Sequence, residues 1–152
     1  AQELSTEERT AMIEGMVSSL AERLRDEPYD TEGWVKLARS YEVLKRPKDL
    51  RNALERAANF NPNNVEILTF YARALRAANS GKQSSPSVLI MRKILTIEPS
   101  NIEALWFVAQ AELAAGDGAK AEILLSQALA KLPANSVEYE QVKRAIEKLD
   151  SE

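Results

Sequence analysis

The segment TEGWVKLARSY, Thr31 to Tyr41, decides the fold because its apolar side chains recur at helical spacing. Trp34, Leu37, Ala38 and Tyr41 stand at relative offsets of 0, 3, 4 and 7. These offsets place the four side chains on one face of a 3.6-residue helix. Because Ala38 is too small to fill space by itself, this face predicts a second helix that passes close over the alanine.

Four prolines extend this pattern along the chain, since each one follows the end of a helix-like segment. Pro28, Pro62, Pro99 and Pro133 are separated by 34, 37 and 34 residues. A fixed period in this range is typical of stacked helical repeats. The register also holds within the units: the first helices share a small residue at Ala38, Ala72 and Ala109, and the second helices share one position at Ala57, Ile94 and Ala128. We therefore expect an all-α stack of helix pairs.

The repeat unit resembles the tetratricopeptide repeat (TPR), a helix-turn-helix of 34 residues. Unit one matches it at Trp34, Leu37, Ala38, Tyr41, Leu54, Ala57 and Pro62, and departs from it at Leu50, where alanine is usual. Unit three matches at Leu105, Val108, Ala109, Gly116, Ala121, Leu125, Ala128 and Pro133. The resemblance implies a right-handed superhelix of three TPR repeats with a further helix at either end.

The predicted organisation is a single TPR domain over residues 1–152. An N-terminal helix covers residues 5–26 and opens with a capping-box pattern from Ser5 to Glu8. The repeats cover residues 31–64, 65–101 and 102–135, and a capping helix covers residues 136–150. Repeat 2 is three residues longer than the others, and its surplus falls in a loop at residues 79–81. After this loop we expect Ser85 to be an N-cap and Pro86 to be the first helical residue.

In such a stack, ligands bind the concave surface that is lined by the first helix of each repeat unit. By the geometry of the repeat, the side chains on this surface stand one, five and eight residues after the Trp34 position. They are Val35, Arg39 and Glu42 in unit one, Thr69, Arg73 and Arg76 in unit two, and Trp106, Gln110 and Leu113 in unit three. Arginines and a tryptophan in one hollow predict a peptide ligand with an apolar side and an anionic group. The alternatives are solvated arginines and, for Trp106, packing at the edge of the core.

The first helix carries two methionines and a glycine whose roles have to be assigned. Met12 and Met16 lie on its apolar stripe, and we interpret them as core residues. Gly15 lies between them and costs about 1 kcal/mol relative to alanine inside a helix. Close packing against another helix is the expected reason for this glycine.

The composition argues against an enzyme. The 152 residues include no cysteine and no histidine, which removes thiolate nucleophiles, imidazole bases and the usual zinc ligands. We therefore expect no catalytic residue, no metal and no cofactor. A net charge of −3 with only short basic clusters does not favour nucleic acid as a partner. The chain also has no apolar run long enough to span a membrane.

A narrower resemblance covers residues 12 to about 142. The segments MIEGMV (12–17), LAERL (20–24), EPSNIEALWFVAQAELAAGD (98–117) and LPANSVEYEQV (132–142) together resemble the periplasmic TPR domain of the cytochrome c maturation proteins CcmI and CycH. The resemblance implies a periplasmic domain that holds the C-terminal helix of apocytochrome c and presents it to the other haem ligation components. It also implies a membrane tether through a segment absent from this chain. A generic TPR scaffold for another partner in bacterial envelope assembly or secretion stays open.

Overall fold

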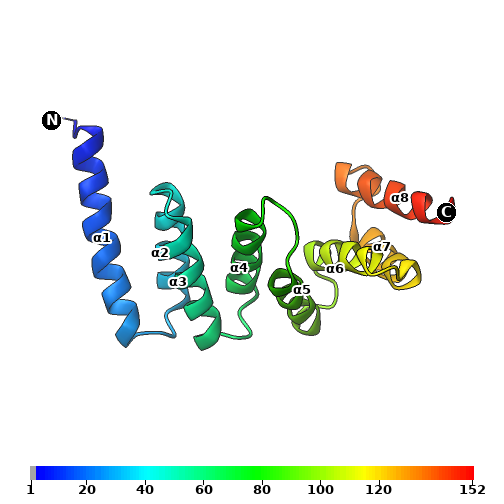
Figure 1. Cartoon of the computed structure of the whole chain (residues 1–152), viewed down its shortest axis with the longest axis horizontal. Coiled ribbons are helices and arrows are strands. Elements are labelled where there is room, and N and C mark those ends of the chain that lie inside the picture. Colours follow the sequence, from blue (N-terminus) through cyan, green and yellow to red (C-terminus); the bar gives the residue numbers. More distant parts are fainter. Residues whose placement is uncertain (1–2) are drawn as a thin grey trace. The chain divides into compact units, whose positions relative to one another are not determined.

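The computed structural model describes residues 3–152, and within this range it contains eight α-helices and no β-strand (Figure 1). The helices are α1 (Thr6–Asp26), α2 (Thr31–Val43), α3 (Pro47–Phe60), α4 (Val65–Ala78), α5 (Ser85–Ile97), α6 (Ile102–Ala114), α7 (Gly118–Lys131) and α8 (Val137–Asp150). The predicted all-α class is therefore confirmed. None of these helices combines the length and the apolar character that a membrane span requires.

The helices form two compact units, each made of four helices that are consecutive in the chain. Unit 1 holds α1 to α4 and ends at Ala78, and unit 2 runs from Asn79 to Glu152 and holds α5 to α8. Within each unit, every helix packs against the next one along the chain (Figure 1). The boundary falls inside the predicted repeat 2, at the start of its three-residue insertion.

The small residues lie where consecutive helices approach each other, as the sequence of α2 predicts. Ala38 is fully buried and shares a cluster with Leu50 and Leu54 of α3 and Ala74 of α4. In the other first helices of the repeats, the equivalent residues Ala72 and Ala109 are also fully buried. The position that the second helices share is fully buried as well, at Ala57, Ile94 and Ala128. Any larger side chain at the alanine positions would push the helices apart.

Side-chain caps fix several helix starts, and one of them differs from the prediction. The capping box at α1 is confirmed, because Glu8 N–H donates to Ser5 Oγ at 3.2 Å and Ser5 N–H donates to Glu8 Oε2 at 2.8 Å. The N-cap of α5 is Ser84 and not Ser85. Ser84 N–H donates to Ser87 Oγ at 2.9 Å, so a reciprocal box with Ser87 selects the earlier serine. Pro86 is then the second helical residue, where its missing N–H leaves no hydrogen bond unmade.

A leucine at Ala72 is expected to lower the free energy of unfolding by about 1–3 kcal/mol, because added methylenes in a filled core force strain on their neighbours. Ala77 lies on the same helix with an exposed side chain and provides the matched control. The Ala77→Leu variant is expected to stay within about 0.5 kcal/mol of wild type. Urea unfolding followed by circular dichroism measures both values. Equal stability of the two variants would contradict close helix approach at Ala72.

Candidate functional site

A groove of about 1120 Å³ lies in unit 1, chiefly between α1 and α2. Seven of its sixteen lining residues have apolar side chains, and these come from one face of each helix. They are Met12, Ile13, Met16, Val17 and Leu20 of α1 and Val35 and Val43 of α2. The apolar stripe of α1 and the outward side of α2 therefore form a continuous hydrophobic surface that is open to a ligand.

The methionines of α1 are exposed, so their interpretation as core residues is wrong. Met12 is 53% exposed and Met16 is 57% exposed, whereas Met91 of α5 is fully buried. The apolar stripe of α1 is wider than the surface of α2 that packs against it. Val17 and Leu24 occupy the covered part of the stripe, and the methionines occupy the uncovered part. Flexible, polarisable methionine side chains in this position suit a surface that adapts to a ligand.

Gly15 also lines the groove, and the expectation that it packs closely against another helix is wrong. Apart from its chain neighbours and the α1 backbone, no described heavy atom lies within 4 Å of the position that a Cβ would take. The residue is exposed. Nothing within unit 1 therefore explains a glycine in the middle of this 21-residue helix.

Basic side chains line the groove beside the apolar surface. Lys36 and Arg39 come from α2, and both are exposed. Arg39 Nη2 lies 4.0 Å from Glu66 Oε1, and the two side chains are 69% and 66% exposed. An exposed pair at this distance stabilises the protein by at most about 1 kcal/mol. Arg39 can therefore exchange Glu66 for an anionic group of a ligand at little cost.

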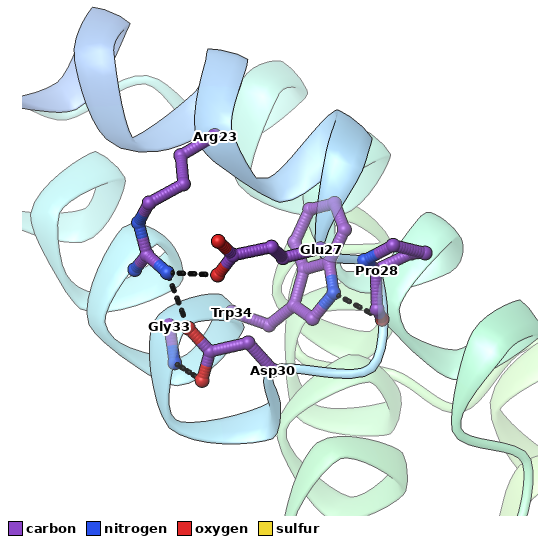
Figure 2. A network of polar contacts seen from close by, with 6 residues as sticks. All are labelled: Arg23, Glu27, Pro28, Asp30, Gly33 and Trp34. Carbon is purple, nitrogen blue, oxygen red and sulfur yellow. Dashed lines mark hydrogen bonds and ion pairs between the residues drawn. The ribbon is translucent and has the colours of Figure 1, made fainter.

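A hydrogen-bonded turn connects the two helices that form the groove (Figure 2). Arg23 of α1 donates from Nη1 to Glu27 Oε2 at 2.7 Å and to Asp30 Oδ2 at 2.9 Å. Asp30 is also the N-cap of α2, where its Oδ1 accepts from Gly33 N–H at 3.0 Å. One carboxylate thus joins the last turn of α1 to the first turn of α2.

Close packing reinforces this turn. A Cβ at Gly33 would overlap the Asp30 carboxylate and lie 2.9 Å from Leu24 Cδ2, so only glycine fits beneath α1. The indole Nε1–H of Trp34 donates to the Pro28 carbonyl at 2.9 Å (Figure 2). This network was not predicted from the sequence, although Asp30 at the start of a helix is a recognisable N-cap residue.

The structure places part of the predicted groove set in this groove. Val35 and Arg39 both line it; Val35 is buried, 8% exposed, whereas Arg39 is exposed. Glu42 is exposed on α2 and is not among the lining residues. Sequence reasoning therefore found two lining residues of α2, but it assigned no groove residue to α1.

The remaining predicted residues lie on α4 and α6. On α4, Thr69 is half-buried, Arg73 is exposed, and Arg76 is 7% exposed. On α6, Trp106 and Leu113 are half-buried against the core cluster of unit 2, and Gln110 is half-buried. Their role in ligand binding stays a prediction.

Unit 2 has a smaller hollow of about 340 Å³ between α5, α6 and α7. Its lining includes Leu95, Val108 and Ile123. The Arg92 Nη2 atom lies 2.7 Å from Glu112 Oε1, and the Glu112 side chain is only 11% exposed. This ion pair neutralises the one buried carboxylate of the hollow.

Comparison with known proteins relates the chain to cytochrome c biogenesis. The family model of the cytochrome c-type biogenesis protein H TPR domain matches residues 2–139. The cytochrome c-type biogenesis protein CycH of Rhizobium meliloti (strain 1021) is 48% identical over 54 residues. This match covers 36% of the chain and 14% of the relative, so the similarity concerns a small part of that longer protein.

Two solved structures of MamA share the fold. Both superpose with a TM-score of 0.63, at 11% and 13% sequence identity. The first superposition covers 99% of this chain and 95% of the MamA chain, and the second covers 93% and 79%. At such low identity the likeness concerns the fold alone.

The turn between α1 and α2 makes the stability of unit 1 depend on pH. Hydrogen bonds from Gly33 N–H and then from Arg23 hold the pKa of Asp30 below its usual value. A carboxyl with a lowered pKa stabilises the fold above its unfolded pKa, about 3.9, and this contribution is lost as the pH falls through the folded pKa. The Asp30→Asn variant is therefore expected to be less stable than wild type at pH 7, by a difference that shrinks below about pH 4.

Urea unfolding at pH 7 and pH 3 measures this difference, because asparagine keeps the N-cap while removing the titrating group. Asp26→Asn changes an exposed carboxyl on α1 and serves as the control. A destabilisation by Asp30→Asn that is equal at both pH values would contradict the role of the Asp30 charge.

Proposed function

Because the chain belongs to the family of cytochrome c-type biogenesis protein H TPR domains, we propose that it acts in cytochrome c maturation. The proposed role is that of a non-enzymatic peptide-binding module. The observation that carries the proposal is the open groove on α1 and α2, whose accessible surface is mainly apolar. Its volume of about 1120 Å³ is slightly larger than that of typical small-molecule pockets, which are about 300–1,000 Å³. A peptide segment therefore fits it better than a metabolite.

The proposed ligand is the C-terminal helix of apocytochrome c. An amphipathic helix in a groove inserts apolar side chains from positions i, i+3, i+4 and i+7. Met12, Met16 and Val43 are more than half exposed, so they offer apolar surface that such a helix would remove from water. Apolar burial of this kind favours binding by about 25 cal/mol per Å² before the costs of association.

The basic residues of α2 favour one orientation of the bound helix in the groove. Lys36 and Arg39 lie on the α2 side of the groove, while the exposed methionines lie on the α1 side. A helix that places its apolar face on α1 can place a terminal carboxylate or an acidic side chain on α2. A charge-assisted hydrogen bond from Arg39 would then replace its weak contact with Glu66.

The proposal extends to the rest of the chain and its surroundings. Thr69, Arg73 and Arg76 of α4 and, separately, Trp106, Gln110 and Leu113 of α6 are assigned as further peptide contacts, Trp106 foremost because of its apolar area. The domain would act in the periplasm and present the held chain to other haem ligation components. A membrane tether would come from a segment outside this chain.

The double variant Met12→Gln, Met16→Gln is expected to bind the helix peptide about tenfold or more weakly than wild type, because two central apolar contacts are lost. The ligand is a synthetic peptide with the C-terminal helix sequence of a c-type cytochrome, and isothermal titration calorimetry gives the affinity. The matched control is Leu89→Gln, which changes a 67% exposed leucine of α5 outside the groove. It is expected to leave the affinity unchanged.

A scrambled peptide of the same composition tests selectivity. Wild type is expected to bind the native sequence and to bind the scrambled one much more weakly. Equal affinity for the two peptides, or no binding of either, would contradict the apocytochrome proposal and favour a TPR scaffold for a different partner.

A further inference from the structure

Gly15 is a residue that the fold of unit 1 does not require. It lies in the middle of α1, where glycine weakens a helix relative to alanine. A methyl group at this position would meet open space, and no positive backbone angle demands a glycine here. Gly33 provides a contrast within the same unit, because there the surrounding atoms leave no room for a Cβ.

The surroundings of Gly15 are those of the groove. Met12 precedes it by three residues, Met16 follows it directly, and Ser19 lies one helical turn later. All four residues line the groove. The bare backbone at Gly15 therefore forms a shallow notch beside two exposed methionine side chains.

We propose that Gly15 is a specificity-determining residue at which the bound helix crosses α1 in direct contact with its backbone. This inference rests on the proposed function, since it concerns the same groove. Helix axes approach to about 8 Å instead of 10 Å where the residue at the crossing is small. A bulky apolar side chain of the ligand, such as leucine or phenylalanine, fills the notch, and the flexible methionines close around it.

The proposal also specifies which groups of the ligand face α1 and which face α2 at the crossing. The apolar residue over Gly15 faces α1, and the anionic group of the ligand faces Lys36 and Arg39 on α2. Met12 and Met16 of α1 and Val43 of α2 offer apolar surface to an amphipathic helix, and the three basic residues of the lining outnumber its two acidic residues, Glu32 and Glu66, which favours an acidic flank on the ligand. The proposed occupant is therefore such a helix from a client protein, and a second copy of this chain is an outcome that the test distinguishes.

The test uses the opposite effects of one substitution on stability and on binding. Gly15→Ala is expected to raise Tm by about 2–4 °C, because alanine favours the helix and meets no neighbour. The same change is expected to weaken binding of the cytochrome helix peptide several-fold. Gly15→Leu fills the notch and is expected to weaken binding at least tenfold. A purely structural role for Gly15 would instead lower Tm in both variants.

Ser18→Leu is the matched control, since it adds a leucine to an exposed position of α1 that is not among the groove residues. It is expected to bind the peptide as wild type does. Calorimetry measures affinity, thermal unfolding measures Tm, and sedimentation velocity of the peptide-free domain measures self-association.

Three results would overturn the inference. Unchanged affinity in Gly15→Leu, with wild type binding the peptide, refutes the crossing at Gly15 and leaves the proposed function intact. Absence of peptide binding by wild type refutes both proposals. Self-association of wild type that Gly15→Leu abolishes would identify a second copy of the chain as the occupant.

Discussion

Close approach of consecutive helices at fully buried alanines is the constraint on which the rest of the structure depends. At Ala38 the side chain is small enough for α3 to pack Leu50 and Leu54 against α2. This contact commits one face of α2 to the core and turns the neighbouring positions outward. Arg39 is exposed for that reason. The residues available to a ligand are therefore a consequence of how tightly the helices pack.

The groove arises because α1 has more apolar surface than its neighbour covers. The turn at Asp30 and Gly33 holds α1 against α2, and Leu24 closes the contact at one end. Further along α1, Met12 and Met16 stay exposed. Covering apolar side chains that are exposed to water is favourable, and for this reason the proposed ligand is assigned to this part of α1.

Local patterns allowed the sequence to predict the helices, the Ser5 capping box and the buried alanines, because each depends on residues only a few positions apart. The start of α5 was misplaced by one residue, since Ser84 and Ser85 both suit an N-cap and the bond with Ser87 decides between them. Val35 and Arg39, which the repeat register selected, line the groove of unit 1, and their role in ligand binding stays a prediction. The interpretations of Met12, Met16 and Gly15 as closely packed residues were wrong, because periodicity identifies an apolar face without revealing how much of it a neighbouring helix covers.

The most direct measurement of the central claim is a titration of the isotope-labelled domain with the apocytochrome helix peptide, followed by two-dimensional ¹H–¹⁵N NMR. If the helix binds in the groove of unit 1, the largest amide shift changes will lie along α1 around Gly15 and along α2 from Val35 to Arg39. Largest changes confined to α7 and α8, or equal changes with the scrambled peptide, would contradict the account.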